Sequence, residues 1–166
     1  MEGLLIEKMD ESSWNDVVKI YKSGIETKNA TFESQVPDWK TWDKAHRIDC
    51  RLVAKIENKI LGWAALSNVS SRCVYSGVAE VSIYVDINCK GQGIGDKLME
   101  ALINESESNN IWTLQAGIFP ENISSIKLHQ KHGFRIVGIR ERIGKMDNIW
   151  RDVTILERRS KVSGMS

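Results

Sequence analysis

The fold of this chain is decided by VAEVSIYV at residues 78–85 and by NCKGQGIGDKLMEALINESE at residues 88–107. The first segment is rich in β-branched residues and alternates with a period of two, which predicts a strand with Glu80 on one of its faces. In the second segment, apolar residues recur at helical spacing from Ile94 to Leu102, which predicts a helix. A cluster of glycines therefore lies between a strand and the start of a helix.

The same periodicities predict the remaining helices and strands. Strands are expected at residues 4–6, 51–56, 60–67, 112–116, 134–139 and 150–156, and helices at residues 14–25, from Asp38 onward and at 122–131. This order of elements is typical of an α/β fold whose sheet contains strands of mixed direction.

Length and charge limit the classes of protein to which the chain can belong. Its 166 residues carry 23 Lys and Arg against 22 Asp and Glu, for a net charge of +1, and 42% are hydrophobic. This length suits one domain with a buried core, which we expect at residues 1–160 with a polar tail at 161–166. A charge near zero provides no field that would hold a nucleic acid or an anionic membrane surface, so we expect neither as a partner.

The cysteines and the apolar segments bear on the compartment. Cys50, Cys73 and Cys89 are an odd number at wide spacing, without a CxxC pair, and the first residues carry no signal-like apolar segment. No apolar run approaches the roughly 20 residues of a transmembrane helix. We therefore expect a cytoplasmic protein. His129 and His132 have no cysteine or carboxylate at ligand spacing, so no metal site is predicted.

The glycine cluster at residues 90–95, Lys-Gly-Gln-Gly-Ile-Gly, has two interpretations. Unpaired backbone N–H groups and the helix dipole at such a position favour a bound pyrophosphate, whereas glycines at a turn also serve close packing. Two nucleotide motifs fit poorly. Asp96 occupies the last glycine position of G-x-G-x-x-G, and Lys97 is neither preceded by Gly nor followed by Ser or Thr, as a P-loop requires. A Rossmann site and an NTPase are therefore disfavoured.

Residues 90–95 resemble the signature Gln/Arg-x-x-Gly-x-Gly/Ala of the GNAT superfamily of acyl-CoA N-acyltransferases. One family within it, the phosphinothricin and methionine sulfoximine N-acetyltransferases, is more similar, through the segments IETKNATFE, RCVYSGVAEVSIYV, IFPENISSIKLHQKHGFRIVG and RERIGKMDNIWRDV. The resemblance extends from Ile25 to Val153. It implies a GNAT-type fold, in which helices flank a mixed, mostly antiparallel central sheet, and acetyl-CoA as the co-substrate without a metal.

The resemblance also implies which residues contact acetyl-CoA. Backbone amides of residues 91–95 would hold the pyrophosphate, and the strand at residues 83–85 would pair with the pantetheine arm. The implied contacts are Ile83, Tyr84, Val85, Lys90, Gly91, Gln92, Gly93, Ile94, Gly95, Asn122 and Ser125. Lys90 departs from the signature, since it keeps the charge of arginine but lacks its fork geometry. This departure bears on affinity more than on the assignment, because the backbone provides most phosphate contacts in such a loop.

Acyl transfer to an amine needs a neutral nucleophile, yet a primary ammonium is mostly protonated at pH 7. Glu80 is our candidate for the base, because its strand precedes the glycine cluster and the general base proposed for the family aligns with it. We expect apolar strand neighbours to desolvate its carboxylate. The alternative is a strand glutamate that faces solvent or forms a salt bridge.

His129 is the second catalytic candidate. The resemblance places it where much of the superfamily has a tyrosine, seven residues after Asn122. An imidazolium at that position would protonate the departing CoA thiolate. The alternative is a structural role, because a lone helical histidine often serves only as a hydrogen-bond partner.

Three residues are candidates for binding the amine substrate. Arg72 and Tyr75 form an R-x-x-Y element before the strand of Glu80, and an arginine can clamp a carboxylate through two parallel hydrogen bonds. Phe32 matches a family position that packs on the substrate. Each of the three is also compatible with ordinary anchoring of a loop.

Together these features predict a cytoplasmic enzyme that transfers acetyl from acetyl-CoA to the α-amino group of a small amino acid, by direct attack in a ternary complex. The resemblance implies methionine sulfoximine, methionine sulfone and phosphinothricin as acceptors, and it implies a homodimer. Two alternatives stay open. One is an acetyltransferase for another amine, such as a protein N-terminus or a polyamine, and the other is a CoA-binding regulatory module without catalysis.

Overall fold

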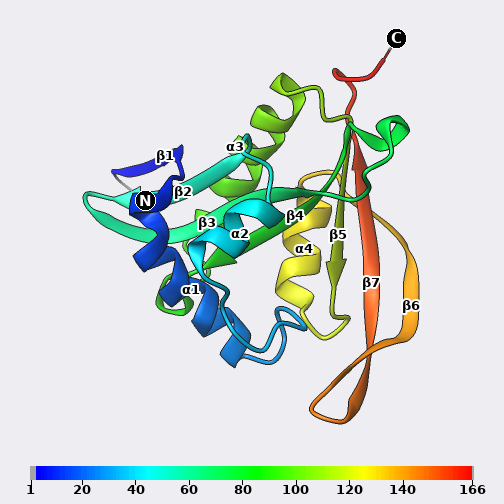
Figure 1. The fold of residues 1–166 in the computed structure, drawn as a ribbon, viewed down its shortest axis with the longest axis horizontal. Helices are drawn as coiled ribbons and strands as arrows, with labels where there is room; N and C mark the ends of the chain where they lie inside the picture. Colours follow the sequence, from blue (N-terminus) through cyan, green and yellow to red (C-terminus); the bar gives the residue numbers. More distant parts are fainter. Residues whose placement is uncertain (1–2, 166) are drawn as a thin grey trace.

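The computed structural model describes residues 3–165, and its strands form one mixed sheet (Figure 1). The seven strands lie in the order β1-β2-β3-β4-β5-β7-β6. Their bounds are β1 (Leu4–Lys8), β2 (Arg51–Ile56), β3 (Lys59–Asn68), β4 (Val78–Val85), β5 (Thr113–Ile118), β6 (Arg135–Met146) and β7 (Ile149–Arg159). Every neighbouring pair is antiparallel except β4 and β5, so the predicted mixed, mostly antiparallel sheet is confirmed.

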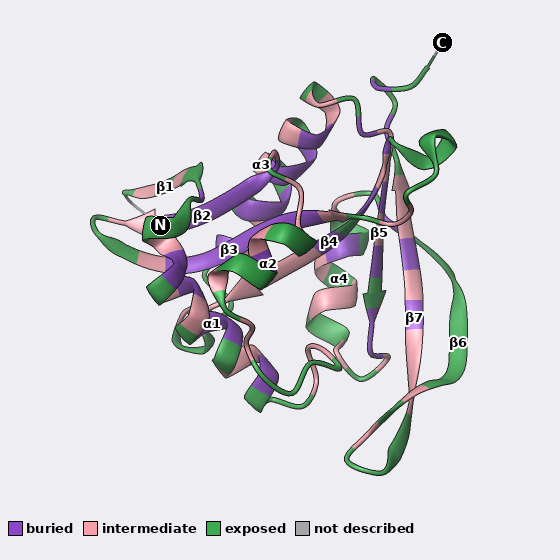
Figure 2. Cartoon of the chain, viewed as in Figure 1, coloured by how far each residue is buried: buried purple, intermediate pink, exposed green. Residues whose placement is uncertain are grey.

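Helices pack on both faces of this sheet. Their bounds are α1 (Trp14–Glu26), α2 (Trp39–Ala45), α3 (Ile94–Ser108) and α4 (Ile123–Lys131), with short 3-10 helices η1 (Glu11–Ser13), η2 (Cys73–Tyr75) and η3 (Ile87–Cys89). Alternate residues of β2 point to opposite faces, so Val53 packs with α1 and α2 while Leu52 packs with α3. Figure 2 shows the buried stretches of β2, β3 and α3. Among the described helices, none is long and apolar enough to span a membrane.

Tryptophans dominate the face that α1 and α2 cover. Trp39 and Trp42 stack with ring centroids 5.7 Å apart. Beside them Arg51 is only 7% exposed, and its guanidinium donates to Asp43 Oδ1 at 2.5 Å and to the carbonyl of His46 at 2.9 Å. A buried guanidinium with satisfied donors fixes the end of α2 against β2.

The two C-terminal strands are longer than the sequence predicted. β6 extends to Met146 and β7 begins at Ile149, so their hairpin projects beyond β5 (Figure 1). Asp147 and Asn148 at the turn have φ of 49° and 64°, the left-handed conformation that favours a two-residue hairpin turn. The periodicity is hidden in the sequence because β6 is an exposed edge strand whose register shifts twice, between Ile136 and Gly138 and between Arg140 and Gly144.

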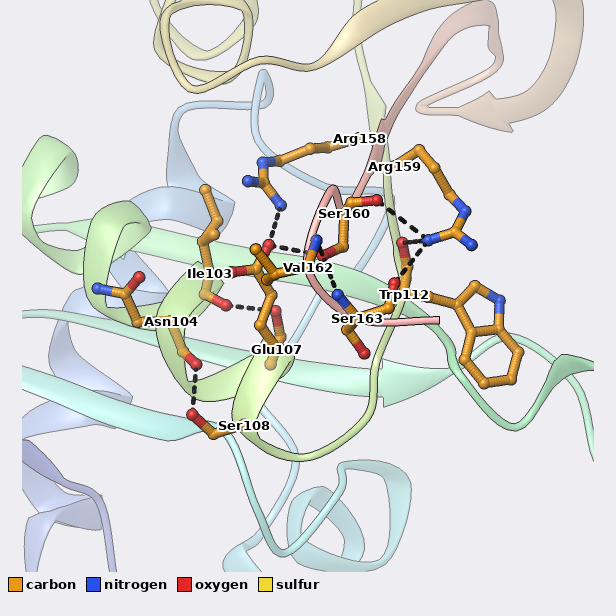
Figure 3. Close-up of polar contacts among 11 residues, drawn as sticks. Ile103, Asn104, Glu107, Ser108, Trp112, Arg158, Arg159, Ser160, Val162 and Ser163 are labelled. Atoms are coloured by element: carbon orange, nitrogen blue, oxygen red, sulfur yellow. Dashed lines mark hydrogen bonds and ion pairs between the residues drawn. The ribbon is translucent and has the colours of Figure 1, made fainter. Parts of the chain in front are cut away.

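Residues at the end of β7 and after it fold back onto α3 and the start of β5 (Figure 3). The carboxylate of Glu107 accepts hydrogen bonds from Arg158 Nη1 at 3.0 Å and from Ser160 Oγ at 2.8 Å. Glu107 and Arg158 are each about four-fifths buried, with side chains 17% and 20% exposed. This charged pair therefore joins the end of α3 to the last strand.

Arg159 forms a second set of hydrogen bonds in the same region. Its guanidinium donates to four carbonyl groups, those of Trp112, Ser160, Ser163 and Gly164. Within the segment expected as a polar tail at 161–166, Ser163 is 8% exposed, and residue 166 lies outside the described residues. We refer to Glu107, Trp112 and residues 158–164 as the C-terminal clasp.

Candidate active site

A cleft opens where two neighbouring strands separate. β4 and β5 pair in parallel only between Val78–Glu80 and Thr113–Gln115. Beyond these residues β4 still pairs with β3 as far as Val85, and β5 still pairs with β7 as far as Ile118. The edges of β4 and β5 that face each other there have no ladder partner among the described residues. Such edges offer backbone N–H and C=O groups to an extended ligand.

This cleft has a volume of about 380 Å³, which is within the range of small-molecule sites. Of the residues that the sequence predicted for the site, the cleft is lined by Phe32, Glu80, Ile83, Tyr84, Asn122, Ser125 and His129. They come from the loop after α1, from β4 and from α4 with its N-cap. Residues far apart in the sequence therefore meet at the separation of β4 and β5.

Glu80 lies at the point where β4 and β5 begin to separate. Its Oε2 accepts a hydrogen bond from Gln115 Nε2 at 3.0 Å, and its side chain is exposed. The expectation of a desolvated carboxylate is wrong for the described chain, because Glu80 lines an open cleft instead of packing among apolar neighbours. Val81, Ser82, Ile83 and Tyr84 also line the cleft, so residues from both faces of β4 contribute to it. The carboxylate is thus accessible to a small molecule in the cleft.

His129 is almost fully buried, with 2% of its surface exposed. Its Nδ1 lies 2.8 Å from the carbonyl oxygen of Ser125, and its ring meets Phe134 edge-on with centroids 4.9 Å apart. Since a carbonyl oxygen can only accept, Nδ1 carries the hydrogen of this bond. The other ring nitrogen, Nε2, is buried and has no hydrogen-bond partner in the described part of the chain.

The surroundings of His129 keep its imidazole neutral. Burial lowers the pKa of His129, the hydrogen bond to Ser125 opposes this shift, and the charge of His132 adds to it. A neutral ring with its hydrogen on Nδ1 has a lone pair on Nε2. His129 belongs to the lining of the cleft, but its Nε2 is buried beneath the surface of that lining, and the acid role expected from the sequence needs an imidazolium.

Tyr84 connects the cleft to the tryptophan-rich face of the sheet. Its ring stacks on Trp63, with centroids 4.8 Å apart and planes 13° apart. A Cβ at Gly24 of α1 would lie 2.7 Å from the Tyr84 ring, so glycine allows the helix to approach this closely. Burial raises the pKa of Tyr84, so its phenol stays protonated at neutral pH.

The glycine cluster forms an open loop before α3. Gly91 and Gly93 have φ of 76° and 81°, which favours glycine, and a Cβ on either would meet nothing within 4 Å. Gly93 is the N-cap of α3, so the first N–H groups of the helix are oriented toward this loop. Asp96 in the first turn binds Lys131 Nζ at 2.8 Å, which ties the start of α3 to α4. Residues 90–95 lie outside the cleft lining.

The N-cap of α4 anchors the loop that follows α1. Asn122 Oδ1 accepts from the backbone N–H of Ser125 at 3.3 Å, and Asn122 Nδ2 donates to the carbonyl of Asn29 at 3.1 Å. From β7, Arg151 Nη1 donates to the carbonyl of Lys28 at 2.9 Å. Two residues on distant elements therefore hold this loop against the cleft.

Phe32 on the anchored loop forms an aromatic wall of the cleft. Its ring meets Phe119 edge-on with centroids 4.9 Å apart. On its other side lies Gly144 of the hairpin, where an added Cβ would come within 2.6 Å of the Phe32 ring. The Phe32 side chain is still 39% exposed, so part of it is available to a ligand.

Arg72 and Tyr75 are the other residues predicted to bind the amine substrate, and both lie outside the cleft lining. Both are exposed around η2, and the Arg72 guanidinium lies 5.6 Å from the centre of the Tyr75 ring. Sequence reasoning missed several residues that do line the cleft, among them Phe119, Arg140, Ile143, Val153 and Ile155. Residues 140–149 had entered only through the family resemblance, because the irregular register of β6 conceals its alternation, whereas Val153 and Ile155 lie in the strand predicted at residues 150–156.

Comparison with known proteins establishes the family. A model of the acetyltransferase (GNAT) domain matches residues 5–155 of the chain. This chain is a GNAT acetyltransferase. The resemblance seen in the glycine cluster and the four other segments is therefore confirmed at the level of the family.

Individual relatives align with this GNAT acetyltransferase over different shares of its sequence. The Bacillus subtilis protein YwnH is 35% identical over 86% of this chain and 90% of its own length. A phosphinothricin N-acetyltransferase of Alcaligenes faecalis is 29% identical over 86% of this chain and 75% of its own. An L-methionine sulfoximine/L-methionine sulfone acetyltransferase of Pseudomonas aeruginosa is 30% identical over 60% of this chain and 58% of its own.

Among solved structures, a phosphinothricin acetyltransferase from Sinorhizobium meliloti in complex with AcCoA superposes with a TM-score of 0.88. The match covers 99% of this chain and 92% of that chain at 22% sequence identity, and it shows that the two share the GNAT fold.

The GNAT acetyltransferase uses acetyl-CoA, and its described residues suit this co-substrate. The open backbone at Gly91 and Gly93 leaves room for a phosphate that a side chain would fill. The unpaired edge of β4 beyond Glu80 leaves backbone groups for an extended arm. Across residues 3–165, no group of three or more His, Cys, Asp or Glu side chains could hold a metal ion.

Proposed function

We propose that this enzyme acetylates the α-amino group of a small amino acid, with methionine sulfoximine, methionine sulfone and phosphinothricin as acceptors. The observation that carries the proposal is the accessible carboxylate of Glu80 in a cleft of about 380 Å³ between the separating strands. The named activities of the Alcaligenes faecalis and Pseudomonas aeruginosa relatives support the same class of acceptor.

In the proposed ternary complex, the amine attacks the thioester directly and no acyl-enzyme forms. Acetyl-CoA supplies the activated acetyl group. Glu80 accepts a proton from the acceptor ammonium, and the hydrogen bond from Gln115 to one carboxylate oxygen orients the group and leaves the other oxygen free. Backbone N–H groups of the unpaired β4 edge near Val85 polarise the thioester carbonyl.

His129 completes the proposed catalytic pair in its neutral form. Because Nδ1 donates to Ser125, the free lone pair of the ring is on Nε2, which is buried behind the cleft lining and must become accessible to a bound ligand before it can accept a proton. Burial keeps the ring neutral, so His129 can protonate the departing thiolate only with a proton that it has first received. This order of proton transfers replaces the simple acid role.

The remaining binding residues follow from the resemblance. Backbone amides of residues 91–95 hold the pyrophosphate, residues 83–85 pair with the pantetheine arm, and Phe32 packs on the acceptor. Open space at Gly91 and the cleft position of Phe32 support these assignments. For Arg72 and Tyr75, binding of the acceptor carboxylate is proposed on the resemblance alone.

We also propose that residues 1–160 form one catalytic domain, that the enzyme is a cytoplasmic homodimer and that β6 belongs to the dimer interface. β6 is the edge strand of the sheet and exposes apolar side chains, of which Ile139 is 57% exposed. An exposed apolar edge strand favours pairing with another chain. Light scattering should give twice the 18.8 kDa of one chain, and Ile139→Lys should lower that mass. A monomeric wild-type protein would contradict the interface.

The direct test is release of free thiol from acetyl-CoA by the purified enzyme. Methionine sulfoximine, methionine sulfone, phosphinothricin, the common amino acids, a peptide and spermidine are each offered as acceptor. Turnover confined to the first three is the expected result. Turnover on the peptide or spermidine alone would show that the enzyme acetylates another class of amine and not a small amino acid. Tight CoA binding without any turnover would favour a regulatory module.

A further inference from the structure

Arg151 on β7 contacts two separate segments that carry walls of the cleft. Its Nη1 donates to the carbonyl of Lys28 at 2.9 Å, and its Nη2 pairs with Glu121 Oε2 at 3.3 Å. The guanidinium carbon also lies 4.0 Å from the centre of the Phe119 ring, within the range of a cation–π contact. With 15% of the side chain exposed, one guanidinium holds together the loop after α1 and the turn before α4.

The strand register places Arg151 at the end of the cleft where Phe32 lies. Alternate residues of β7 share a face, so Arg151 follows Ile155 and Val153, which both line the cleft. On β6, the partner of Arg151 is Gly144, where an added Cβ would come within 2.6 Å of the Phe32 ring. Arg151 itself lies outside the cleft lining. It is therefore next to the aromatic wall and does not face the ligand space.

Arg151 acts on Phe32 by two routes. The first is through the backbone, because Lys28 begins the segment that leads to Phe32 and has a φ of 58°, which a residue with a side chain seldom adopts. The hydrogen bond from Arg151 holds the carbonyl of this turn. The second route is through Phe119, whose ring lies between the guanidinium and the Phe32 ring and meets the latter edge-on at 4.9 Å. Both the start of the loop and the ring at its tip thus depend on Arg151.

We propose that Arg151 is a positioning residue for the amine substrate, because it fixes the aromatic wall formed by Phe32 and Phe119. This inference rests on the proposed acetylation of a small amino acid, in which Phe32 packs on the acceptor. A wall that is already ordered binds a ligand at a lower entropic cost than one that must be ordered on binding. Arg151 therefore sets the affinity for the acceptor and takes no part in the proton transfers.

The test measures KM for methionine sulfone, KM for acetyl-CoA and kcat in the wild type, Arg151→Met and Arg151→Lys. Methionine keeps an unbranched side chain of similar length and removes every donor. In Arg151→Met, displacement of the wall should raise the acceptor KM about 10-fold, while kcat and the KM for acetyl-CoA stay within about twofold. Lysine keeps the charge but lacks the planar fork, so Arg151→Lys should give an intermediate acceptor KM and tests the same role if the methionine variant does not fold.

A double-mutant cycle shows whether Arg151 acts through Phe32. Phe32→Ala removes the ring that Arg151 positions, so Arg151→Met should raise the acceptor KM little further in that background. Independent effects, in which the two rises multiply, would show that Arg151 acts by another route and would overturn the inference.

Glu107→Ala is the control for a general loss of stability, because it breaks a largely buried ion pair outside the cleft lining. It should lower the melting temperature but leave the acceptor KM within about twofold. An unchanged acceptor KM in folded Arg151→Met and Arg151→Lys, or an equal rise in Glu107→Ala, would overturn the inference. If the wild type acetylates no amino acid, the proposed function itself fails, which is distinguishable from an active enzyme whose acceptor KM does not respond to Arg151.

Discussion

The C-terminal clasp and the cleft treat their polar groups in opposite ways. In the clasp, Glu107 accepts from two donors, and Arg159 donates to four carbonyl groups (Figure 3). In the cleft, the exposed carboxylate of Glu80 accepts one hydrogen bond, from Gln115, within the described residues. A polar group satisfied inside the protein stabilises the fold, whereas one that is accessible where a ligand can enter is available for binding or chemistry. Substitutions in the two regions should therefore affect different measurements.

The largest expected effect is that of Glu80→Gln on turnover. Glutamine can still accept the Gln115 hydrogen bond but cannot accept a proton as a base, so kcat should fall about 100-fold or more. The KM for acetyl-CoA and the melting temperature should stay nearly unchanged. Steady-state kinetics and thermal unfolding measure both.

Glu157→Gln is the matched control for Glu80→Gln. Glu157 is in register with Gln115 on the same sheet but pairs with Arg135 and lies outside the cleft lining. Its replacement should leave kcat within about twofold. Equal turnover by Glu80→Gln and the wild type would remove Glu80 from the role of base.

The next effect belongs to the clasp. Glu107→Ala leaves the largely buried guanidinium of Arg158 without its partner and should lower the free energy of unfolding by about 2 kcal/mol. For a chain of this length the melting temperature should fall by roughly 4–8 °C, with kcat nearly unchanged at 25 °C. Glu100→Ala, on the same helix, breaks an exposed ion pair with Lys97 and should cost less than about 0.5 kcal/mol. Similar losses of unfolding free energy in Glu107→Ala and Glu100→Ala would contradict a special stabilising role for the buried pair.

Buried histidines give a smaller effect that depends on pH. Burial lowers the pKa of His129 and of His46 in the folded chain, so near pH 6 the unfolded chain binds more protons. Their stabilising contribution is complete above the ordinary pKa of about 6.5 and is lost as the pH falls below it, by at most about 1.4 kcal/mol per pH unit for each histidine. The midpoint of urea unfolding should therefore decrease from pH 7.5 to pH 6 and again to pH 5.

The pH range in which the histidines titrate lies above the range in which the carboxyl groups titrate. The pKa values of Asp38 and Asp96 are lowered from 3.8, so their contributions are lost only as the pH falls below about 4. His129→Gln should flatten the dependence between pH 7.5 and 5, and His46→Gln should do the same independently. If both variants keep the wild-type dependence, other groups titrate in this range.

The smallest expected effect comes from Gly144→Ala. The added methyl group would lie 2.6 Å from the Phe32 ring, which must move within the acceptor end of the cleft. The KM for the acceptor should rise a few-fold, while the KM for acetyl-CoA and the stability change little, since a flexible side chain can move at low cost. Gly138→Ala on the same strand is the control, because its Cβ would meet nothing within 4 Å. An equal rise of the acceptor KM in Gly138→Ala would show that the effect does not depend on Phe32.

Prediction from the sequence located the strand that forms one wall of the cleft. Glu80 and Tyr84 of β4 both line it, together with Val81 and Ile83 from the opposite face of the strand, whereas residues 90–95 lie outside the lining. It failed where exposure depends on packing, since Glu80 is exposed and not desolvated. It also failed at the hairpin, where an irregular edge strand hid Arg140 from any periodic pattern.

By itself, the sequence determined the order of helices and strands, the glycine loop before α3 and membership of the GNAT family. The elements and the loop follow from residue spacing along the chain, because helix and strand periodicity and positive φ are local properties, and the family follows from the resemblance of the quoted segments and the matching domain model. Only the tertiary structure decided the hydrogen position on His129, the contacts of Arg151 and the packing of Ser163 on the clasp. These depend on partners from distant segments, and the sheet order and the separation of β4 from β5 bring those segments together or keep them apart.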